Sequence, residues 1–391
     1  MTATKLIGNI ITPDRIIKDG EVCFSENRIT YVGTKRNNDI EYNIIDYSGL
    51  YIAPGFIDIH IHGGGGHDFT DGTIEAFLGV AQLHAQHGTA TMLSTTLSCT
   101  DEELFSLFNI FEKAKNTENN GSYLAGIHIE GPYVALSQKG AQDERYIKTP
   151  NPEHYNKILE KSNSILRWTI APELDGAMEL GRKLRSMNIL PCIGHSDALY
   201  ETALEAYENG FTIMTHFYSG MSSMIRKQGF RFPGLIESGY LIENMDVEII
   251  ADGCHLPAPI LNYVWKQKGP DRVALVTDSM RAAGQTEGVS VLGSKENGLP
   301  VIIEDGVAKL MDKTAFGGSI ATTDRLVRTM VQTAAVPLLD TVKMMTRTPA
   351  RIVGLKNKGT IAPNFDADFT VFDNNINIMS TISNGKTIYK A

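Results

Sequence analysis

Two histidines stand two residues apart in an otherwise apolar run, "FIDIHIHGGGG", which spans residues 56–66. Side chains alternate along a β-strand, so Asp58, His60 and His62 would share one face and the isoleucines the other. Buried polar side chains are costly without partners, so this face needs something to bind. A divalent cation would satisfy both imidazoles, and Asp58 would then orient a ligand from outside the coordination sphere. The alternative is a pair of hydrogen-bonded core histidines.

Residue types that bind metals recur at the ends of later apolar runs. They are Glu130, His195, His216, Asp252 and Asp278. Aspartate is common where a turn begins, but histidine is not a turn-forming residue, so its repetition indicates another role. Imidazoles and carboxylates are the ligands that zinc and similar divalent cations take. Together with His60 and His62 they favour a metal site over core histidines, whereas for His128 we expect a hydrogen-bonded position inside the fold.

The elements that must position these residues alternate between strand and helix patterns. The apolar runs of strand length are "FIDIHIH", "TATMLSTT", "LAGIHIE", "LRWTIAPE", "ILPCIGH", "FTIMTH", "VEIIAD" and "VALVTD". Helix-period segments separate most of them, which predicts an α/β fold with a parallel (β/α)8 TIM-like barrel. Such barrels carry their catalytic groups at the C-terminal ends of strands, where these side chains stand. An open doubly wound sheet is the alternative, but no GxGxxG motif follows the first strand.

The two ends of the chain have a different pattern. Residues 1–53 contain short strand-like runs and turn signals without a helical segment, and residues 359–391 return to this pattern. We therefore predict a small β-sandwich domain built from both ends and a barrel domain over residues 54–358. Within the barrel, residues 289–314 have the pattern of inserted hairpins, and a helix is expected over residues 322–336.

Composition excludes several classes of function. The chain of 391 residues has a net charge of −9 at pH 7, which argues against a nucleic-acid partner. No apolar stretch is long enough to span a bilayer and the N-terminus has no signal-peptide pattern, so we expect no membrane partner and a cytoplasmic location. The four cysteines have neither disulfide nor zinc-ribbon spacing and are expected as small buried side chains: Cys23, Cys99, Cys192 and Cys254.

Five further motifs follow the predicted strands: "EGPY", "GHSDA", "THFYSGM", "ADGCHL" and "TDSMRAAG". In combination they make the chain resemble the amidohydrolase superfamily and, within it, the N-acetylglucosamine-6-phosphate deacetylase family, over essentially its whole length. The resemblance implies an enzyme of amino sugar metabolism that hydrolyses the N-acetyl group of N-acetylglucosamine 6-phosphate to glucosamine 6-phosphate and acetate. Many superfamily members bridge two metals with a carboxylated lysine on the fourth strand. Here that strand ends in "IAPE", and Glu130 matches the bridging residue of the deacetylase branch.

The resemblance also implies roles for single residues. Those with an implied role in metal binding are His60, His62, Glu130, His195, His216 and Asp278. The set matches members with one or two divalent ions per subunit, and zinc or iron suits these ligands. Asp278 is the implied general base and then general acid, and His255 is implied to polarise the acetamide carbonyl.

The substrate side departs from the family pattern. The residues at positions that the resemblance associates with substrate are Gln142, Ser219, Gly220, Arg231 and His255. The family motif THxYNAM reads "THFYSGM" here and REPG reads "RFPG", so Ser219, Gly220 and Phe232 replace Asn, Ala and Glu. These departures keep a related substrate open as an alternative, such as N-acetylgalactosamine 6-phosphate. A non-catalytic binding protein is a further alternative, and the missing lysine weakens cyclic-amide hydrolysis. A homodimer is implied by resemblance alone.

Overall fold

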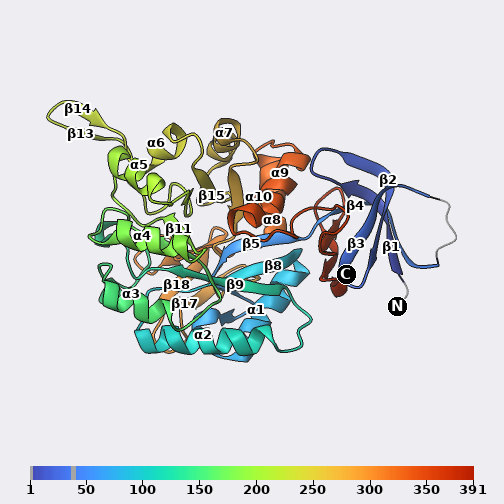
Figure 1. The fold of residues 1–391 in the computed structure, drawn as a ribbon, viewed down its shortest axis with the longest axis horizontal. Coiled ribbons are helices and arrows are strands. Elements are labelled where there is room, and N and C mark those ends of the chain that lie inside the picture. The colour runs from blue at the N-terminus through green and yellow to red at the C-terminus, as the bar shows by residue number, and fades with distance from the viewer. Residues whose placement is uncertain (1–2, 37–40) are drawn as a thin grey trace.

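The computed structural model describes residues 3–36 and 41–391, and its larger part is a parallel sheet surrounded by helices (Figure 1). In this part of the chain, eight strands pair in the order β16-β15-β12-β11-β10-β9-β8-β5, so that neighbours in the sheet follow one another in sequence. Their bounds are β5 (Phe56–Ile61), β8 (Thr89–Thr95), β9 (Tyr123–Glu130), β10 (Ile165–Ile170), β11 (Leu190–Ile193), β12 (Ile213–Met214), β15 (Asp246–Ile250) and β16 (Val273–Val276). This arrangement confirms the predicted barrel.

The barrel closes between its first strand, β5, and its last strand, β16. Just beyond β16, the amide of Asp278 donates a hydrogen bond to the carbonyl of His60 at 2.9 Å. The amide of His62 donates in turn to the carbonyl of Ser279 at 2.9 Å. We call this junction, residues 60–63 and 277–279, the seam of the barrel. The seam therefore brings the predicted metal ligands His60 and His62 next to the predicted ligand Asp278.

Helices follow most strands, as the alternating pattern predicts. Their bounds are α1 (Ile74–Gln86), α2 (Asp101–Lys115), α3 (Pro152–Leu159), α4 (Ala177–Ser186), α5 (Tyr200–Glu208), α6 (Leu235–Leu241), α7 (Ala258–Lys268), α8 (Thr323–Arg328), α9 (Leu338–Met345) and α10 (Arg347–Ile352). The side chain of Thr73 caps α1, and Thr100 forms a capping box with Glu103 at the start of α2. The helix expected over residues 322–336 begins as α8 and continues as a π-helical turn, Thr329–Thr333. No helix in the described ranges is long and apolar enough to cross a membrane.

The interior of the barrel is polar, whereas branched apolar side chains usually fill this fold. The buried side chains that hydrogen-bond to one another there are Asp58, His60, Thr95, His128, Arg167, Thr169, Thr215, Glu248 and Thr277. Nε2 of His128 lies 2.7 Å from the hydroxyl of Thr169, which confirms the hydrogen-bonded interior position expected for this histidine. The main apolar core lies instead between the strands and the helices, where Phe77, Phe108 and Trp168 are buried.

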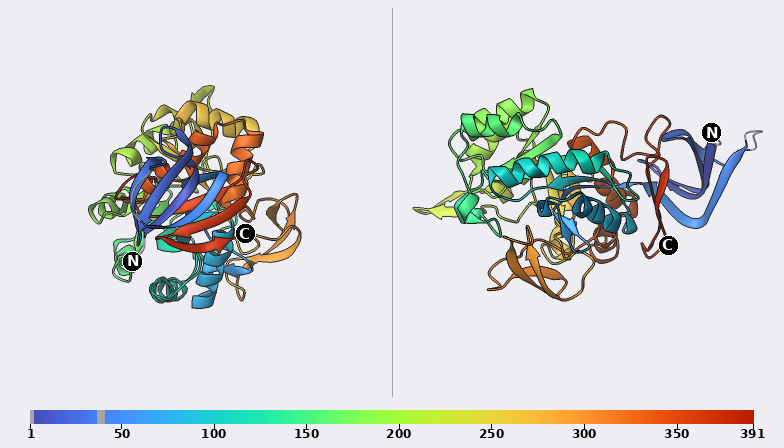
Figure 2. Two further views of the ribbon diagram at one scale, coloured as in Figure 1. Left: turned by 90° about the vertical axis from the view of Figure 1, so that its right-hand side faces the viewer. Right: turned by 90° about the horizontal axis from the view of Figure 1, so that it is seen from below.

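The two ends of the chain share a second sheet, in the order β22-β21-β20-β4-β1-β2-β3. Its strands are β1 (Ala3–Ile11), β2 (Ile16–Ser25), β3 (Arg28–Thr34), β4 (Tyr42–Pro54), β20 (Phe369–Phe372), β21 (Ile378–Ser383) and β22 (Lys386–Lys390). β1 and β4 separate β2 from β20, so a flat sheet would place β2 about 14 Å from β20. The rings of Phe24 on β2 and Phe369 on β20 have centroids only 5.5 Å apart. The sheet therefore folds over, and its halves form the two layers of the predicted sandwich (Figure 2).

Short strands form three further ribbons. After β16, the strands β17 (Gly288–Leu292), β18 (Leu299–Glu304) and β19 (Val307–Leu310) pair antiparallel, which confirms the predicted insertion of hairpins. β6 (Gly63–Gly64) and β7 (His67–Asp68) pair directly after β5. A hairpin of β13 (Ile225–Lys227) and β14 (Phe230–Phe232) projects away from the barrel in both views (Figures 1 and 2). The predicted domain boundaries after residues 53 and 358 stay predictions, since β4 runs on to Pro54.

Candidate active site

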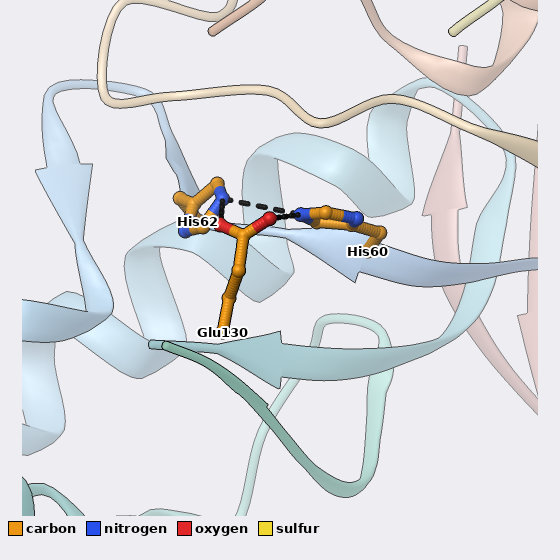
Figure 3. A group of neighbouring side chains, drawn as sticks. All are labelled: His60, His62 and Glu130. Carbon is orange, nitrogen blue, oxygen red and sulfur yellow. Dashed lines mark hydrogen bonds and ion pairs between the residues drawn. The ribbon is translucent and has the colours of Figure 1, made fainter. Parts of the chain in front are cut away.

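The two histidines of the first barrel strand point toward a carboxylate from β9 (Figure 3). His60 and His62 approach each other through their Nε2 atoms, 3.3 Å apart. The carboxylate of Glu130 lies 3.4 Å from each, with Oε1 facing His60 and Oε2 facing His62. All three side chains are at most 3% exposed. We call these residues the first ligand triplet.

Glu130 also belongs to a second ligand triplet, with His195 and His216. Its Oε1 atom lies 3.3 Å from Nε2 of His195 and 3.1 Å from Nε2 of His216. The two imidazole nitrogens are 3.0 Å apart. One carboxylate is thus shared by the two groups of imidazoles. The sequence predicted this convergence, because each of these residues stands at the C-terminal end of a strand and these ends meet at one end of the barrel.

Asp278 completes the cluster from the other side of the seam. Its Oδ1 atom lies 3.1 Å from Nε2 of His62 and 3.4 Å from Nε2 of His60. His195, His216 and Asp278 each follow a barrel strand by two residues, and their φ angles are 49°, 32° and 47°. Such left-handed conformations are unfavourable for these residue types, and they occur most often where function fixes the backbone. Here they turn the three predicted ligand side chains toward one point.

The donor set fits a divalent cation. Nitrogen and oxygen ligands bonded to zinc at about 2.0–2.1 Å lie about 3.3–3.4 Å from one another in a tetrahedral site. The distances between Nε2 and carboxylate oxygens in both triplets are 3.1–3.4 Å. The Nε2 atoms of His195 and His216 are 3.0 Å apart, and a cation bound to both lone pairs would hold them this close without a proton between them. The two triplets are thus suited to hold one or two ions through the shared Glu130.

Charges within the cluster perturb its protonation. Burial alone would raise the pKa of Glu130, but His60, His195 and His216 hold it well below its ordinary range. Burial alone would lower the pKa of His62, but Asp278 and Glu130 raise it to about 9. The cluster therefore holds protons on imidazole and negative charge on carboxylates when no cation is bound. Binding a divalent cation would replace these protons.

The mouth of the barrel forms a cavity next to the cluster. Residues at its wall include His62, Glu130, Gln142, His195, His216, Ser219, Gly220, His255, Asp278 and Phe316. Nδ1 of His255 lies 2.8 Å from a carboxylate oxygen of Asp252, and its ring packs edge-on against Phe316 with centroids 4.8 Å apart. Because Asp252 occupies Nδ1, Nε2 of His255 is left for a ligand in the cavity. The structure thus brings the predicted catalytic and metal-binding residues together.

The predicted substrate residues divide into two groups. Gln142, Ser219 and Gly220 line the cavity, but Gln142 also donates a hydrogen bond from Nε2 to Oε2 of Glu130 at 2.9 Å. Gly220 has a φ of 57°, and a Cβ there would lie 3.0 Å from Nδ1 of His195, so this position requires glycine. Arg231 is exposed on β14 and does not line the cavity of its own chain, because the hairpin that carries it leaves the barrel.

The sequence did not predict the roles of two charged residues inside the barrel, Glu248 and Arg167. The sequence predicted that Asp58 would orient a ligand ring, but Asp58 accepts hydrogen bonds from the hydroxyl of Thr277 and the amide of His60 instead. The carboxylate beside the ring of His60 is Glu248, with Oε1 2.7 Å from Nδ1 of His60. Arg167 pairs with Glu248 at 2.6 Å. Both stand within apolar strands, "LRWTI" and "VEIIAD", and a charge in a buried strand is the signal that could have identified them.

Comparisons with known proteins agree with this geometry. Residues 51–388 match the amidohydrolase family. Proteins named N-acetylglucosamine-6-phosphate deacetylase from Lysinibacillus sphaericus and Bacillus subtilis (strain 168) are each 30% identical to this chain. The alignments cover 95% and 97% of this chain and 92% and 95% of those relatives.

Solved structures are similar over the whole fold. A mutant N-acetyl-D-glucosamine-6-phosphate deacetylase from Mycobacterium smegmatis, in complex with N-acetyl-D-glucosamine 6-phosphate, superposes with a TM-score of 0.91 and 25% identity. The match covers 100% of both chains. This likeness extends to the small domain as well as to the barrel. The chain belongs to the amidohydrolase family and, within it, to the N-acetylglucosamine-6-phosphate deacetylases.

Proposed function

We propose that this protein hydrolyses the N-acetyl group of N-acetylglucosamine 6-phosphate to glucosamine 6-phosphate and acetate, with bound divalent cations. The observation that carries the proposal is one cavity that joins the two ligand triplets, the carboxylate of Asp278 and the imidazole of His255. These are the groups that metal-assisted amide hydrolysis needs. The relatives named above act on this sugar phosphate according to their names.

The division of chemical labour follows from the positions of the side chains. A divalent cation bound by the triplets would lower the pKa of a water molecule and polarise the acetamide carbonyl. Asp278 is ionised, because His60 and His62 lower its pKa although burial raises it. Its carboxylate takes a proton from the attacking water and then delivers it to the leaving nitrogen. The second transfer is needed because an unprotonated amine is a poor leaving group.

His255 acts on the carbonyl end of the substrate. Asp252 accepts a hydrogen bond at Nδ1 of His255 and fixes the orientation of the ring. An Nε2–H of this ring would donate to the carbonyl oxygen, where negative charge develops during attack. Gln142 holds the shared carboxylate of Glu130 in place by its hydrogen bond of 2.9 Å. Gly220 lies at the cavity wall, where its backbone amide would be a further donor for the sugar.

The number and identity of the ions belong to the same proposal. With both triplets complete, we expect two ions per chain, and zinc or iron suits ligands of imidazole and carboxylate. Elemental analysis of the purified protein measures both quantities. Less than one ion per chain after incubation with zinc, iron or manganese, together with no acetate release, would favour the alternative of a non-catalytic binding protein.

A second substrate is favoured by specific departures on the substrate side. Ser219 and Gly220 line the cavity where the family pattern has Asn and Ala, which supports N-acetylgalactosamine 6-phosphate as the alternative. The test is acetate release from both epimers, each with and without the 6-phosphate. We expect the phosphorylated gluco epimer to have the highest kcat/KM. A preference of tenfold or more for the galacto epimer, about 1.4 kcal/mol in transition-state binding, would reverse the assignment.

Arg231 bears on the oligomeric state. Its side chain is exposed on the projecting hairpin and does not line the cavity of its own chain. We propose a homodimer in which this hairpin approaches the cavity of a second copy, where the guanidinium binds the 6-phosphate. Light scattering measures the state, and an Arg231→Ala variant should lose affinity for the phosphorylated substrate only. The cytoplasmic location stays a prediction.

A further inference from the structure

A buried ion pair lies in the barrel interior beneath the ligand cluster. Nη1 of Arg167 on β10 is 2.6 Å from Oε2 of Glu248 on β15, and neither side chain is exposed at all. The guanidinium also donates to the carbonyl of Ile59 at 3.3 Å and to the hydroxyl of Thr215 at 3.2 Å. A buried ion pair gives little net stability, because desolvation of both charges offsets their attraction. Its presence here therefore calls for a reason other than stability.

The second oxygen of Glu248 contacts both ligand triplets. Oε1 lies 2.7 Å from Nδ1 of His60, which belongs to the first triplet. The same atom accepts a hydrogen bond of 3.0 Å from the backbone amide of His216, which belongs to the second. His216 has a left-handed φ of 32°, and this hydrogen bond holds its amide in that conformation. One carboxylate thus touches a ligand ring on one side and a ligand backbone on the other.

The other ligand imidazoles are held differently. Nδ1 of His195 lies 2.7 Å from the backbone carbonyl of Gln138, a neutral acceptor. Nδ1 of His62 and Nδ1 of His216 have no hydrogen-bond partner among the residues that the structure describes. Each triplet therefore contains one imidazole with a fixed Nδ1, and only that of His60 is fixed by an anion. An anionic acceptor fixes the tautomer and also makes the opposite nitrogen a stronger ligand.

We propose that Glu248, held by Arg167, is the positioning residue that gives the first ligand triplet its affinity for a metal ion. The inference rests on the proposed function, because it concerns the same metal centre. With Nδ1–H of His60 donating to Glu248, the Nε2 lone pair is directed into the cluster. Arg167 keeps the carboxylate from turning away, since it binds Oε2 and leaves Oε1 facing His60. The second triplet depends on Glu248 only through the backbone of His216.

The test compares metal binding by the full-length parent and a Glu248→Gln variant. Both are loaded with zinc, dialysed against a series of chelator-buffered zinc concentrations and analysed for ions per chain. We expect two classes of site in the parent. In the variant, the affinity of one class should fall by about 10- to 100-fold while the other changes much less. Cobalt-loaded samples should show the same loss in visible absorption.

Two further variants separate positioning from a merely structural role. Glu248→Gln alone leaves the buried guanidinium of Arg167 without its carboxylate partner. The double variant Arg167→Met/Glu248→Gln removes this unpaired charge as well and should restore the melting temperature toward that of the parent. Metal affinity of the first triplet should stay low, because His60 still lacks its anionic acceptor. Thr169→Val is the matched control, since it removes a buried hydroxyl whose hydrogen-bond partners are His128 and Thr215, neither of which belongs to a ligand triplet.

Several results would overturn the inference. One is a Glu248→Gln variant that binds two ions per chain with the affinities of the parent. Another is a double variant that recovers metal affinity together with thermal stability, which would make the role structural. A parent that binds a single ion whose affinity Glu248→Gln leaves unchanged would also overturn it, because the first triplet would then be no metal site. None of these measurements uses a sugar substrate. The proposed deacetylation is tested by acetate release instead, so the two proposals can fail independently.

Discussion

Gln142 donates a hydrogen bond of 2.9 Å to Oε2 of Glu130, the carboxylate that both ligand triplets share. Its own Oε1 accepts from the amide of Ser98 at 2.8 Å, so the side chain is held at both ends. A residue expected to bind substrate is therefore also a support for the metal centre. Substitutions at this position should affect turnover more than substrate affinity.

Gln142→Leu tests this support. Hydrogen bonds to charged groups contribute about 1.5–3 kcal/mol, so we expect kcat to fall about 10- to 100-fold with a smaller change in KM. Gln138→Leu is the control, because the side chain of Gln138 bonds to Asp197 and not to a ligand. Steady-state kinetics on both variants gives the answer. A rise in KM with unchanged kcat would return Gln142 to a role in substrate binding alone.

Asp278→Asn tests the proton transfers. The amide can neither accept a proton from water nor deliver one to the amine, so turnover should fall about 10²- to 10⁴-fold. The second triplet does not include Asp278, so at least one ion per chain should remain. Turnover and metal content are measured on the same sample. Near-parental turnover in a metal-loaded variant would rule out Asp278 as the acid and base.

Gly220→Ala tests the close packing at the cavity wall. The left-handed backbone makes any side chain unfavourable by about 1–2 kcal/mol, and the new methyl group would also press on His195 and the carbonyl of Gln138. Gly229→Ala is a matched control, because Gly229 has a φ of 91° and a Cβ added there would meet nothing within 4 Å. Both variants should lose thermal stability. Only Gly220→Ala should also lose metal affinity, and equal metal content in both would contradict the packing argument.

His84 gives a pH prediction that does not involve a metal ligand. Burial lowers the pKa of His84 to about 4, while Nε2–H donates to the carbonyl of Gly63 and Nδ1 has no partner among the described residues. Below about pH 6.5, His84 is protonated in the unfolded chain but stays neutral in the folded chain. The free energy of unfolding therefore falls as the pH is lowered toward 4. The loss from this group is about 3 kcal/mol.

A His84→Asn variant isolates that effect. Unfolding by urea is followed at several pH values for both proteins, each freed of metal. The parent should lose about 3 kcal/mol more than the variant between pH 6.5 and pH 4, and the two curves should run parallel above pH 7. Parallel curves over the whole range would show that His84 becomes protonated inside the fold.

The sequence was most informative where the chemically active side chains follow the regular alternation of a strand or of strands and helices. Alternation along one strand placed His60 and His62 on the same face, and parallel strands placed Glu130, His195 and His216 at one end of the barrel. These inferences need only the order of strands and helices. The position of His128 inside the fold followed in the same way.

Contacts across the barrel could not be predicted in this way. Whether Glu248 or Asp58 reaches the ring of His60 depends on how far neighbouring strands are staggered, and one residue of stagger changes the partner. The exposed position of Arg231 depends on the direction of a hairpin whose two strands bury little. In both cases tertiary geometry decides between residues that the local pattern treats alike.

The seam between β5 and β16 has a consequence for how the protein reaches its active form. His60 lies on the first barrel strand and His62 directly follows it, whereas Asp278 follows the last strand. The amide of Asp278 donates to the carbonyl of His60, so the first and last strands of the barrel are joined directly at this point. An ion bound by His60 and His62 that also took the carboxylate of Asp278 as a ligand would therefore cross-link the two ends of the barrel. Without such an ion, the two ends are joined by backbone hydrogen bonds and by side-chain contacts such as that between Thr277 and Asp58.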